Sequence, residues 1–133
     1  MKKKKPKKKT NAQWRRINAV PLAKKLAIKR DKKCMKCGHD GSRYKLHGSH
    51  ILPEGKYHWL SADLDNIIAL CSMCHLFAPD SWHSSPKEQD WFDVKYPHRV
   101  KMLKSKNELL GKGFVDFKAI YLELKKLIQL FEK

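Results

Sequence analysis

Acidic residues are missing from the first quarter of this sequence. Residues 1–30 contain 13 lysines and arginines but no aspartate or glutamate, which leaves 17 basic and 13 acidic residues for the rest of the chain. Most of the formal charge of +17 therefore belongs to an N-terminal arm. Such a charge favours a polyanionic partner, because each phosphate that a lysine or arginine neutralises releases condensed counterions.

Long apolar runs are missing as well. No stretch approaches the roughly 20 apolar residues that cross a bilayer, and no apolar segment follows the lysine run as it would in a signal peptide. We therefore expect no membrane association and an intracellular location, in the cytoplasm of a bacterium or of a virus-infected cell. The lysine run also has the composition of a nuclear-import signal, so the nucleus is the alternative compartment.

Arginine is scarce, with 5 arginines against 25 lysines. Lysine contacts phosphate as a point charge, whereas arginine reads guanine through two parallel hydrogen bonds, so we expect weak sequence preference.

Like charges repel, so residues 1–15 are predicted to be a disordered basic arm. A solubilising tail is the alternative to a phosphate-binding arm. The residues expected to contact nucleic acid are Lys2, Lys3, Lys4, Lys5, Lys7, Lys8, Lys9, Arg15 and Arg16.

The sequence has only four cysteines, which form two Cys-x-x-Cys pairs: Cys34 with Cys37 and Cys71 with Cys74. Two such pairs are typical of one tetrahedral zinc ion held by four thiolates. In a reducing compartment this assignment fits better than two disulfides. A structural metal also helps a domain this small to fold, because its hydrophobic core alone contributes little stability.

Periodicity predicts an α+β fold in a single domain, residues 16–133. A helix is expected from Pro21, a strand over residues 43–52, a second short strand containing Trp59 and Leu60, and a buried run at Ile67–Leu70. Ser85-Pro86-Lys87-Glu88 is typical of a helix start. The last helix, at about residues 114–132, has one apolar face, which packs on the core or binds a partner.

The cysteine pairs enclose a histidine strand that ends in His50-Ile, and Asn66 stands five residues ahead of Cys71-x-x-Cys74-His75. This pattern resembles the zinc-containing HNH endonucleases of the ββα-metal class, over residues 34–95. Trp59 and the trailing His83-x-x-Pro86 make it similar to small phage and prophage HNH nucleases, and more loosely to NinG-type recombination nucleases. The resemblance implies a zinc-stapled ββα-metal (HNH) core with additional flanking helices.

The resemblance also implies roles for individual residues. His50 would be the general base, because imidazole titrates near neutrality. Asn66 would hold the loop that orients His50. His75 and His83 would bind a catalytic divalent ion, with His47 as a further candidate ligand. Mg²⁺ or Mn²⁺ is the expected ion, and a histidine-rich site would also suit Ni²⁺ or Zn²⁺.

One position departs from the family pattern. Many HNH proteins carry aspartate directly before the catalytic histidine, where its carboxylate binds the metal, whereas this sequence has Ser49. A serine hydroxyl is a poor ligand for a hard cation. Either His47, Asp65 or Asp80 substitutes for the missing carboxylate, or histidines and water alone hold the ion.

The resemblance predicts a metal-dependent DNA endonuclease that hydrolyses phosphodiester bonds with a histidine base. A phage packaging or recombination protein is the partner that this resemblance implies. The alternative function is a non-catalytic zinc module that binds nucleic acid, or an adaptor that docks through its C-terminal helix.

Overall fold

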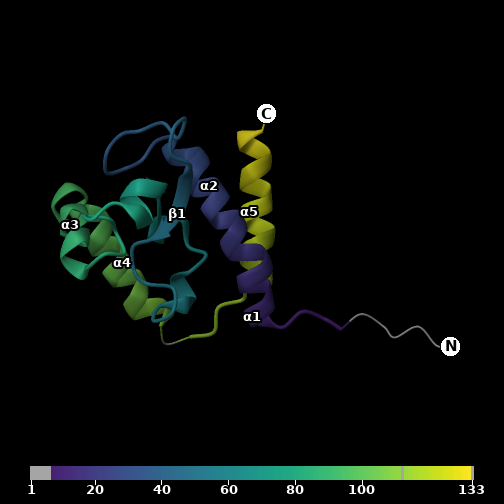
Figure 1. Cartoon of the computed structure of the whole chain (residues 1–133). Helices are drawn as coiled ribbons and strands as arrows, with labels where there is room; N and C mark the ends of the chain where they lie inside the picture. The colour runs from purple at the N-terminus through teal and green to yellow at the C-terminus, as the bar shows by residue number, and fades with distance from the viewer. Residues whose placement is uncertain (1–6, 112, 133) are drawn as a thin grey trace.

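Two strands and the helices around them make up the part of the chain that the computed structural model describes, residues 7–111 and 113–132 (Figure 1). Strands β1 (Leu46–His50) and β2 (Ile67–Cys71) are antiparallel, and His50 lies opposite Ile67. The helices are α1 (Asn11–Gln13), π-helical η1 (Trp14–Ala19), α2 (Val20–Asp31), 3-10 helices η2 (His58–Leu60) and η3 (Leu64–Asn66), π-helical η4 (Met73–Phe77), 3-10 helix η5 (Pro86–Gln89), α3 (Asp90–Lys95), α4 (Pro97–Leu110) and α5 (Phe117–Phe131).

The helical part of the chain begins at Asn11, inside the segment predicted to be a disordered arm. Thr10 and Gln13 form a capping box, in which each side chain bonds the backbone N–H of the other residue. Trp14 then packs against Tyr121 of α5, with 5.7 Å between ring centroids. The prediction counted charge alone and missed both this cap and this tertiary contact.

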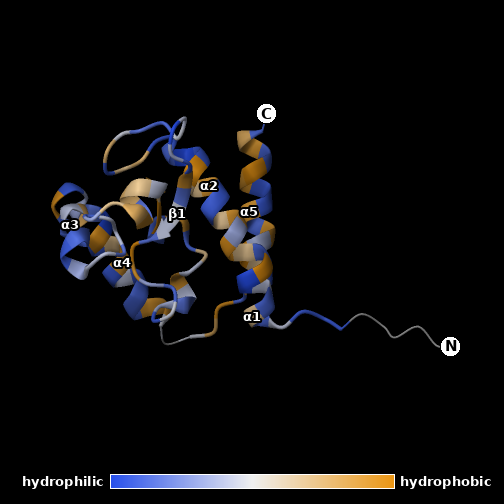
Figure 2. Ribbon diagram, viewed as in Figure 1, coloured by the Kyte–Doolittle hydropathy of each residue, from blue (hydrophilic) through white to orange (hydrophobic). Residues whose placement is uncertain are grey.

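Helix α5 lies alongside α1 and α2 (Figure 1). Apolar and polar residues interleave along it, as Figure 2 shows. Its side chain cap is Asp116, which accepts a hydrogen bond from the N–H of Ala119, so the helix starts slightly later than predicted. Phe117 and Leu124 enter a core shared with α2, whereas Phe131, at the far end, is half exposed.

All five residues of β2 are buried, as predicted for the apolar run. Ile67 packs into the core between α2 and α5, while Ile68 and Leu70 pack into a second core with Trp82 and Phe92. Strand β2 is therefore covered on both sides, which explains its continuous apolar pattern. This packing fixes the position of Cys71 at the end of β2.

The edge of β2 that faces away from β1 is closed by side chains. The guanidinium groups of Arg30 and Arg99 both donate hydrogen bonds to the carbonyl of Ile67, at 2.6 and 2.8 Å. The carboxylate of Asp31 accepts from the N–H of Ala69 at 2.9 Å. A two-stranded sheet leaves such backbone groups unpaired, so these long-range contacts stabilise it.

The α+β prediction is confirmed, with two corrections to its strands. The first strand is shorter than residues 43–52, and Trp59 and Leu60 lie in the helical turn η2 instead of a strand. Hydrogen bonds from the N–H of Leu60 to the Tyr57 carbonyl and from the N–H of Ser61 to the His58 carbonyl close this turn. The backbone of this segment therefore forms hydrogen bonds within a local turn and does not pair with another strand.

Candidate functional site

The four cysteines converge at one end of the sheet. Their sulfur atoms all lie within 4.8 Å of one another, and the Sγ atoms of Cys37 and Cys71 are 3.8 Å apart. A zinc–sulfur distance of about 2.3 Å gives a tetrahedron with edges of about 3.8 Å. The residues therefore fit a Cys₄ zinc site, as the spacing of the two pairs predicted.

Backbone N–H groups around the cluster lower the pKa of one of its thiols. Burial raises the pKa of the Cys34 thiol, but the backbone N–H groups of Cys37, Cys71 and Lys36 outweigh this effect and hold it at about 7. Burial raises the pKa values of Cys37 and Cys74. Binding of an ion by thiolates displaces thiol protons, so metal affinity at such a site increases with pH.

Two histidines meet beyond the second cysteine pair. The N–H of His83 donates to the carbonyl of His75 at 3.3 Å, and the N–H of Trp82 to that of Cys74 at 2.7 Å. This backbone pairing aligns the two histidines, whose Nε2 atoms are 3.0 Å apart. Two ligand atoms about 2.1 Å from an ion and at right angles to each other are also about 3.0 Å apart. The pair therefore fits two adjacent positions around one divalent ion.

His47 lies on the other side of His75. The Nδ1 atoms of the two rings are 3.0 Å apart, so His47 contacts the nitrogen of His75 that faces away from His83. Burial, followed by the charges of His83 and His47, lowers the pKa of His75 to about 4, so this ring is neutral at physiological pH. Neutral imidazole is the form that binds metal. His47 is thus close enough to hydrogen-bond the His75 ring, and its role as a further metal ligand stays a prediction.

His50 closes β1 with its ring held in one orientation. Its Nε2 lies 2.7 Å from the carbonyl oxygen of Ser61, and a carbonyl only accepts, so Nε2 carries the proton. Nδ1 therefore keeps its lone pair, and it lies 4.0 Å from the carboxylate of Glu54. Burial lowers the pKa of His50, against the raising effects of the Ser61 hydrogen bond and the Glu54 charge. The shift favours the neutral ring, whose single proton is on Nε2.

Asn66 is fully buried and ties together the loop between the strands. Its Oδ1 accepts from the N–H of Leu52 at 2.8 Å, and its Nδ2 donates to the carbonyls of Leu52 and Leu60. Its own carbonyl accepts from the N–H of Ile51. The loop that carries the Ser61 carbonyl is therefore pinned by this one side chain.

A pocket of about 260 Å³ brings His50, His75 and His83 together with Ser49 and Glu54. Ser49 is 1% exposed, and its Oγ has no hydrogen-bond partner. A buried hydroxyl without a partner is costly, so Ser49 is an unusual residue for this wall of the pocket. Among the described residues, only the cysteines bring three or more ligand atoms within 4.8 Å. Water or substrate oxygens would therefore have to complete the coordination of an ion bound by the histidines.

Glu54 is the carboxylate that the sequence analysis missed. Asp65 pairs with Lys106 at 2.6 Å and Asp80 with Lys36 at 3.2 Å, and neither aspartate lines the pocket. The position of Glu54 four residues after His50, just past Pro53, was the available signal. Glu54 therefore supplies a carboxylate to the pocket in which Ser49 replaces the aspartate of many HNH proteins.

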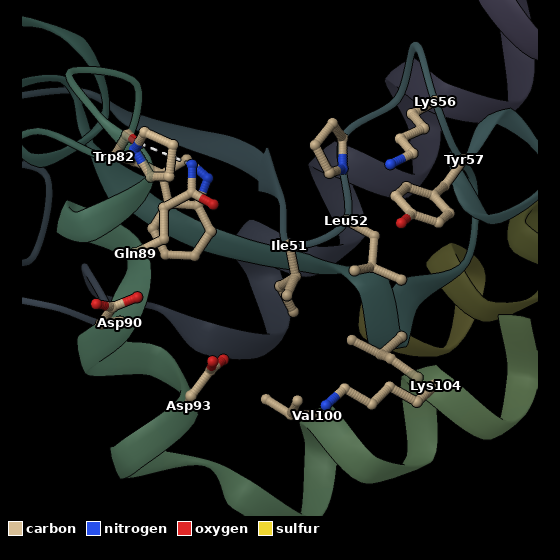
Figure 3. Close-up of a pocket in the computed structure, with 13 residues that line it drawn as sticks. Ile51, Leu52, Lys56, Tyr57, Trp82, Gln89, Asp90, Asp93, Val100 and Lys104 are labelled. Atoms are coloured by element: carbon tan, nitrogen blue, oxygen red, sulfur yellow. Dashed lines mark hydrogen bonds between the residues drawn. The ribbon is translucent and has the colours of Figure 1, made fainter.

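A second pocket, of about 350 Å³, adjoins the first and shares Pro53, Trp82 and Gln89 with it (Figure 3). The Gln89 side chain donates to the Trp82 carbonyl at 2.9 Å, which fixes this common wall. Ile51 lies between the labelled polar groups of the larger pocket in Figure 3. The histidine pocket and the larger pocket are therefore separated by a shared wall.

The predicted nucleic-acid-binding residues are only partly in view, because Lys2, Lys3, Lys4 and Lys5 lie outside the described residues. Lys7, Lys8 and Arg16 are exposed. Lys9 bonds Asn18 at 2.8 Å, and its ammonium lies 4.6 Å from the Trp14 ring. Arg15 is turned toward Phe117, at 6.0 Å from the ring centroid. These two cations thus lie against the helices.

Residues 34–77 match the family model for HNH endonuclease. This segment, one third of the chain, contains the cysteine cluster, His47, His50, Asn66 and His75. The resemblance to the HNH endonuclease family is thereby confirmed, and the chain carries an HNH core. His83 lies outside the matched segment, and the narrower likeness to NinG-type nucleases stays a prediction.

Comparison with curated protein sequences and with solved structures gave no match. Within residues 7–111 and 113–132, none of the helices has both the length and the apolar character needed to cross a membrane.

Proposed function

We propose that this protein is a metal-dependent endonuclease that hydrolyses DNA phosphodiester bonds with His50 as the general base. The hydrogen bond between His50 Nε2 and the Ser61 carbonyl carries the proposal. It leaves Nδ1 as the basic atom in a pocket that also holds His75 and His83. The candidate base and the two candidate ligands thus line one pocket, and His50 and His75 belong to the segment that matches HNH endonuclease.

The proposed reaction is a single hydrolytic displacement at phosphorus. A water oxygen forms a new bond to phosphorus while its proton passes to His50 Nδ1, and the bond from phosphorus to one sugar oxygen breaks. That sugar oxygen takes a proton from solvent. A divalent ion held by His75 and His83 would neutralise the charge that develops on the phosphate and on the leaving oxygen.

The neighbouring residues serve this step by positioning. Asn66 holds the loop that presents the Ser61 carbonyl, and this carbonyl sets the tautomer of His50. His47 occupies the second nitrogen of His75, as outer partners of metal-bound histidines commonly do. A histidine-rich site favours Mn²⁺, Ni²⁺ or Zn²⁺ more than a carboxylate site does, so Mg²⁺ and Mn²⁺ should differ in effectiveness. The Cys₄ ion is structural zinc.

DNA is the proposed substrate because the family match is to an endonuclease domain and the N-terminal arm is basic. Lysine-rich contacts neutralise phosphates without reading bases, so cleavage should show little sequence preference. A phage packaging or recombination protein as partner has no support in the matched segment.

A second function is a zinc module that binds DNA without cutting it. The observation in its favour is the uncharged Ser49 at the position before His50, together with a pocket that offers His75 and His83 as the two candidate ligands. An ion held by two side chains binds weakly, and a site without the ion would keep the scaffold and the basic arm.

Cleavage of a supercoiled plasmid tests the proposed function. Zinc-loaded wild-type protein is compared with His50→Ala and with His98→Ala, which removes an exposed histidine outside the pocket. Each is assayed without added metal and with Mg²⁺, Mn²⁺, Ni²⁺ or Zn²⁺ added singly. We expect metal-dependent cleavage by the wild type and His98→Ala and none by His50→Ala. Binding of the plasmid by all three without cleavage under any metal would favour the zinc-module function.

A further inference from the structure

Lys24 also lines the histidine pocket, although it belongs to α2 and precedes the matched HNH segment. It reaches the pocket because α2 packs directly on β1 at Gly48. A Cβ placed on Gly48 would lie 2.6 Å from the Cβ of Lys24 and 2.9 Å from its Cα. Only glycine permits this approach. It places the aliphatic part of Lys24 against Gly48, two positions before His50 in the same strand.

Lys24 lines the pocket without an anionic partner for its charge. Among the described residues, no hydrogen bond and no ion pair involves its ammonium, whereas Lys36 and Lys106 pair with aspartates. Glu54 lines the same pocket but lies beyond ion-pair distance of Lys24. The lysine is half-buried, so it has given up part of its hydration.

The influence of this charge reaches the three rings. It is one of the causes that lower the pKa values of His47, His50 and His75, after burial in each case. In the free protein the charge of Lys24 disfavours protonation of these rings and gains no attraction from a nearby anion. The same arrangement becomes favourable when an anion enters the pocket between Lys24 and the histidines.

We infer that Lys24 is a further catalytic residue, whose ammonium contacts a non-bridging oxygen of the scissile phosphate opposite the histidine pair. The inference rests on the proposed function. The phosphate gains negative charge as the water oxygen attacks, so a fixed cation stabilises the transition state more than the bound substrate. This role separates Lys24 from the lysines of the arm, which contribute affinity for DNA without a part in the chemical step.

The test compares Lys24→Met with Lys25→Met under single-turnover conditions, with enzyme in excess over plasmid and above its dissociation constant. Lys25 is the exposed next residue of α2, so both variants lose one charge from the same helix. Loss of one preorganised contact to transition-state charge commonly costs about 10²–10³-fold in rate. We expect a decrease of that order for Lys24→Met and less than about threefold for Lys25→Met. DNA affinity without divalent ion should decrease equally in both.

Two results would overturn the inference while leaving the proposed function intact. One is equal cleavage by the two variants, and the other is a defect of Lys24→Met that disappears at saturating enzyme. Zinc content and the thermal midpoint show whether Lys24→Met is folded. Lys24→Gln, whose side chain is shorter and ends in a neutral amide, provides a second variant without the charge. An inactive wild type would instead contradict the proposed function itself.

Discussion

Asn66 has no exposed surface and makes three side-chain hydrogen bonds to the backbone of Leu52 and Leu60. Each of these backbone groups would lose its partner if the amide were removed. Unsatisfied buried polar groups cost about 1–3 kcal/mol each. The side chain is therefore important for the stability of the loop as well as for the orientation of His50.

For Asn66→Ala we expect the free energy of unfolding to decrease by about 2–4 kcal/mol, because three backbone groups lose hydrogen bonds and part of this loss is recovered by water. Chemical denaturation of the zinc-loaded protein measures it. Asn18→Ala is the control, because its single side-chain bond, to Lys9, is exposed and should matter by less than about 0.5 kcal/mol. Equal destabilisation by the two variants would contradict the structural role of Asn66.

The pH dependence of cleavage should report the protonation of His50. The proposed base acts when unprotonated, and burial lowers its pKa below the ordinary 6.5. The rate should therefore be constant above neutrality and decrease as pH falls through a value below 6.5, tenfold for each pH unit beyond it. His75, with its pKa at about 4, stays neutral throughout this range.

Glu54→Gln provides the matched variant for this profile. The Glu54 carboxylate raises the pKa of His50, so its removal should move the acid limb to lower pH. Single-turnover rates between about pH 5 and 8.5 at saturating metal measure the acid limb of the wild type and that of Glu54→Gln. A limb above pH 7, or one that moves upward in Glu54→Gln, would exclude this assignment.

At the scale of elements, the close packing of α2 against β1 depends on the absence of a side chain at Gly48. Any Cβ there would overlap the Cα, Cβ and Cγ atoms of Lys24, and the helix backbone cannot yield without disturbing the core around Ala23 and Leu26. The close approach places the cation in the pocket and buries the sheet at the same time.

Gly48→Ala should accordingly destabilise the protein by about 1–3 kcal/mol through overpacking, and it should slow cleavage because Lys24 is displaced. Gly55→Ala is the control, since a Cβ at Gly55 meets no atom within 4 Å. Thermal unfolding and single-turnover cleavage of both variants provide the measurement. A stable and fully active Gly48→Ala would show that α2 can move away from β1 at no cost.

At the scale of the molecule, positive charge is divided between an arm and a pocket. Residues 2–9 contain seven lysines, while Thr10 already belongs to the folded part as the cap of α1. Removal of residues 2–9 therefore keeps the cap of the first helix, although it also removes the contacts of Lys9 with Asn18 and Trp14. It separates affinity for DNA from the chemistry around His50.

The deletion should weaken DNA binding and make it less sensitive to salt. Each phosphate contact contributes about 0.9 to the slope of log affinity against log salt concentration, so the loss of seven lysines should reduce that slope by up to about 6. Fluorescence anisotropy at several salt concentrations measures it. The single-turnover rate at low salt should change little, and a large loss of rate at saturation would assign the arm a catalytic role.

The sequence by itself determined the parts of this protein that depend on spacing along the chain. Two Cys-x-x-Cys pairs predicted a four-sulfur cluster, and the apolar run before the second pair predicted a buried strand. Both are present, because a two-residue gap places the two sulfurs of each pair together and a continuous apolar run favours burial, while the fold brings the two pairs side by side. The HNH pattern followed from the same short-range features.

Only the tertiary structure decided which charges reach the histidine pocket. Asp65 and Asp80 were candidates by their nearness to the motif, yet lysines of distant segments bind both, while Glu54 lines the pocket. Lys24 arrives from 24 residues before Gly48 because of one helix–strand contact. Such positions depend on the path of a loop and the packing of a helix, and no periodicity in the sequence specifies these. The physical reason is that the pocket is made of long-range contacts, which form only when the two cores are complete.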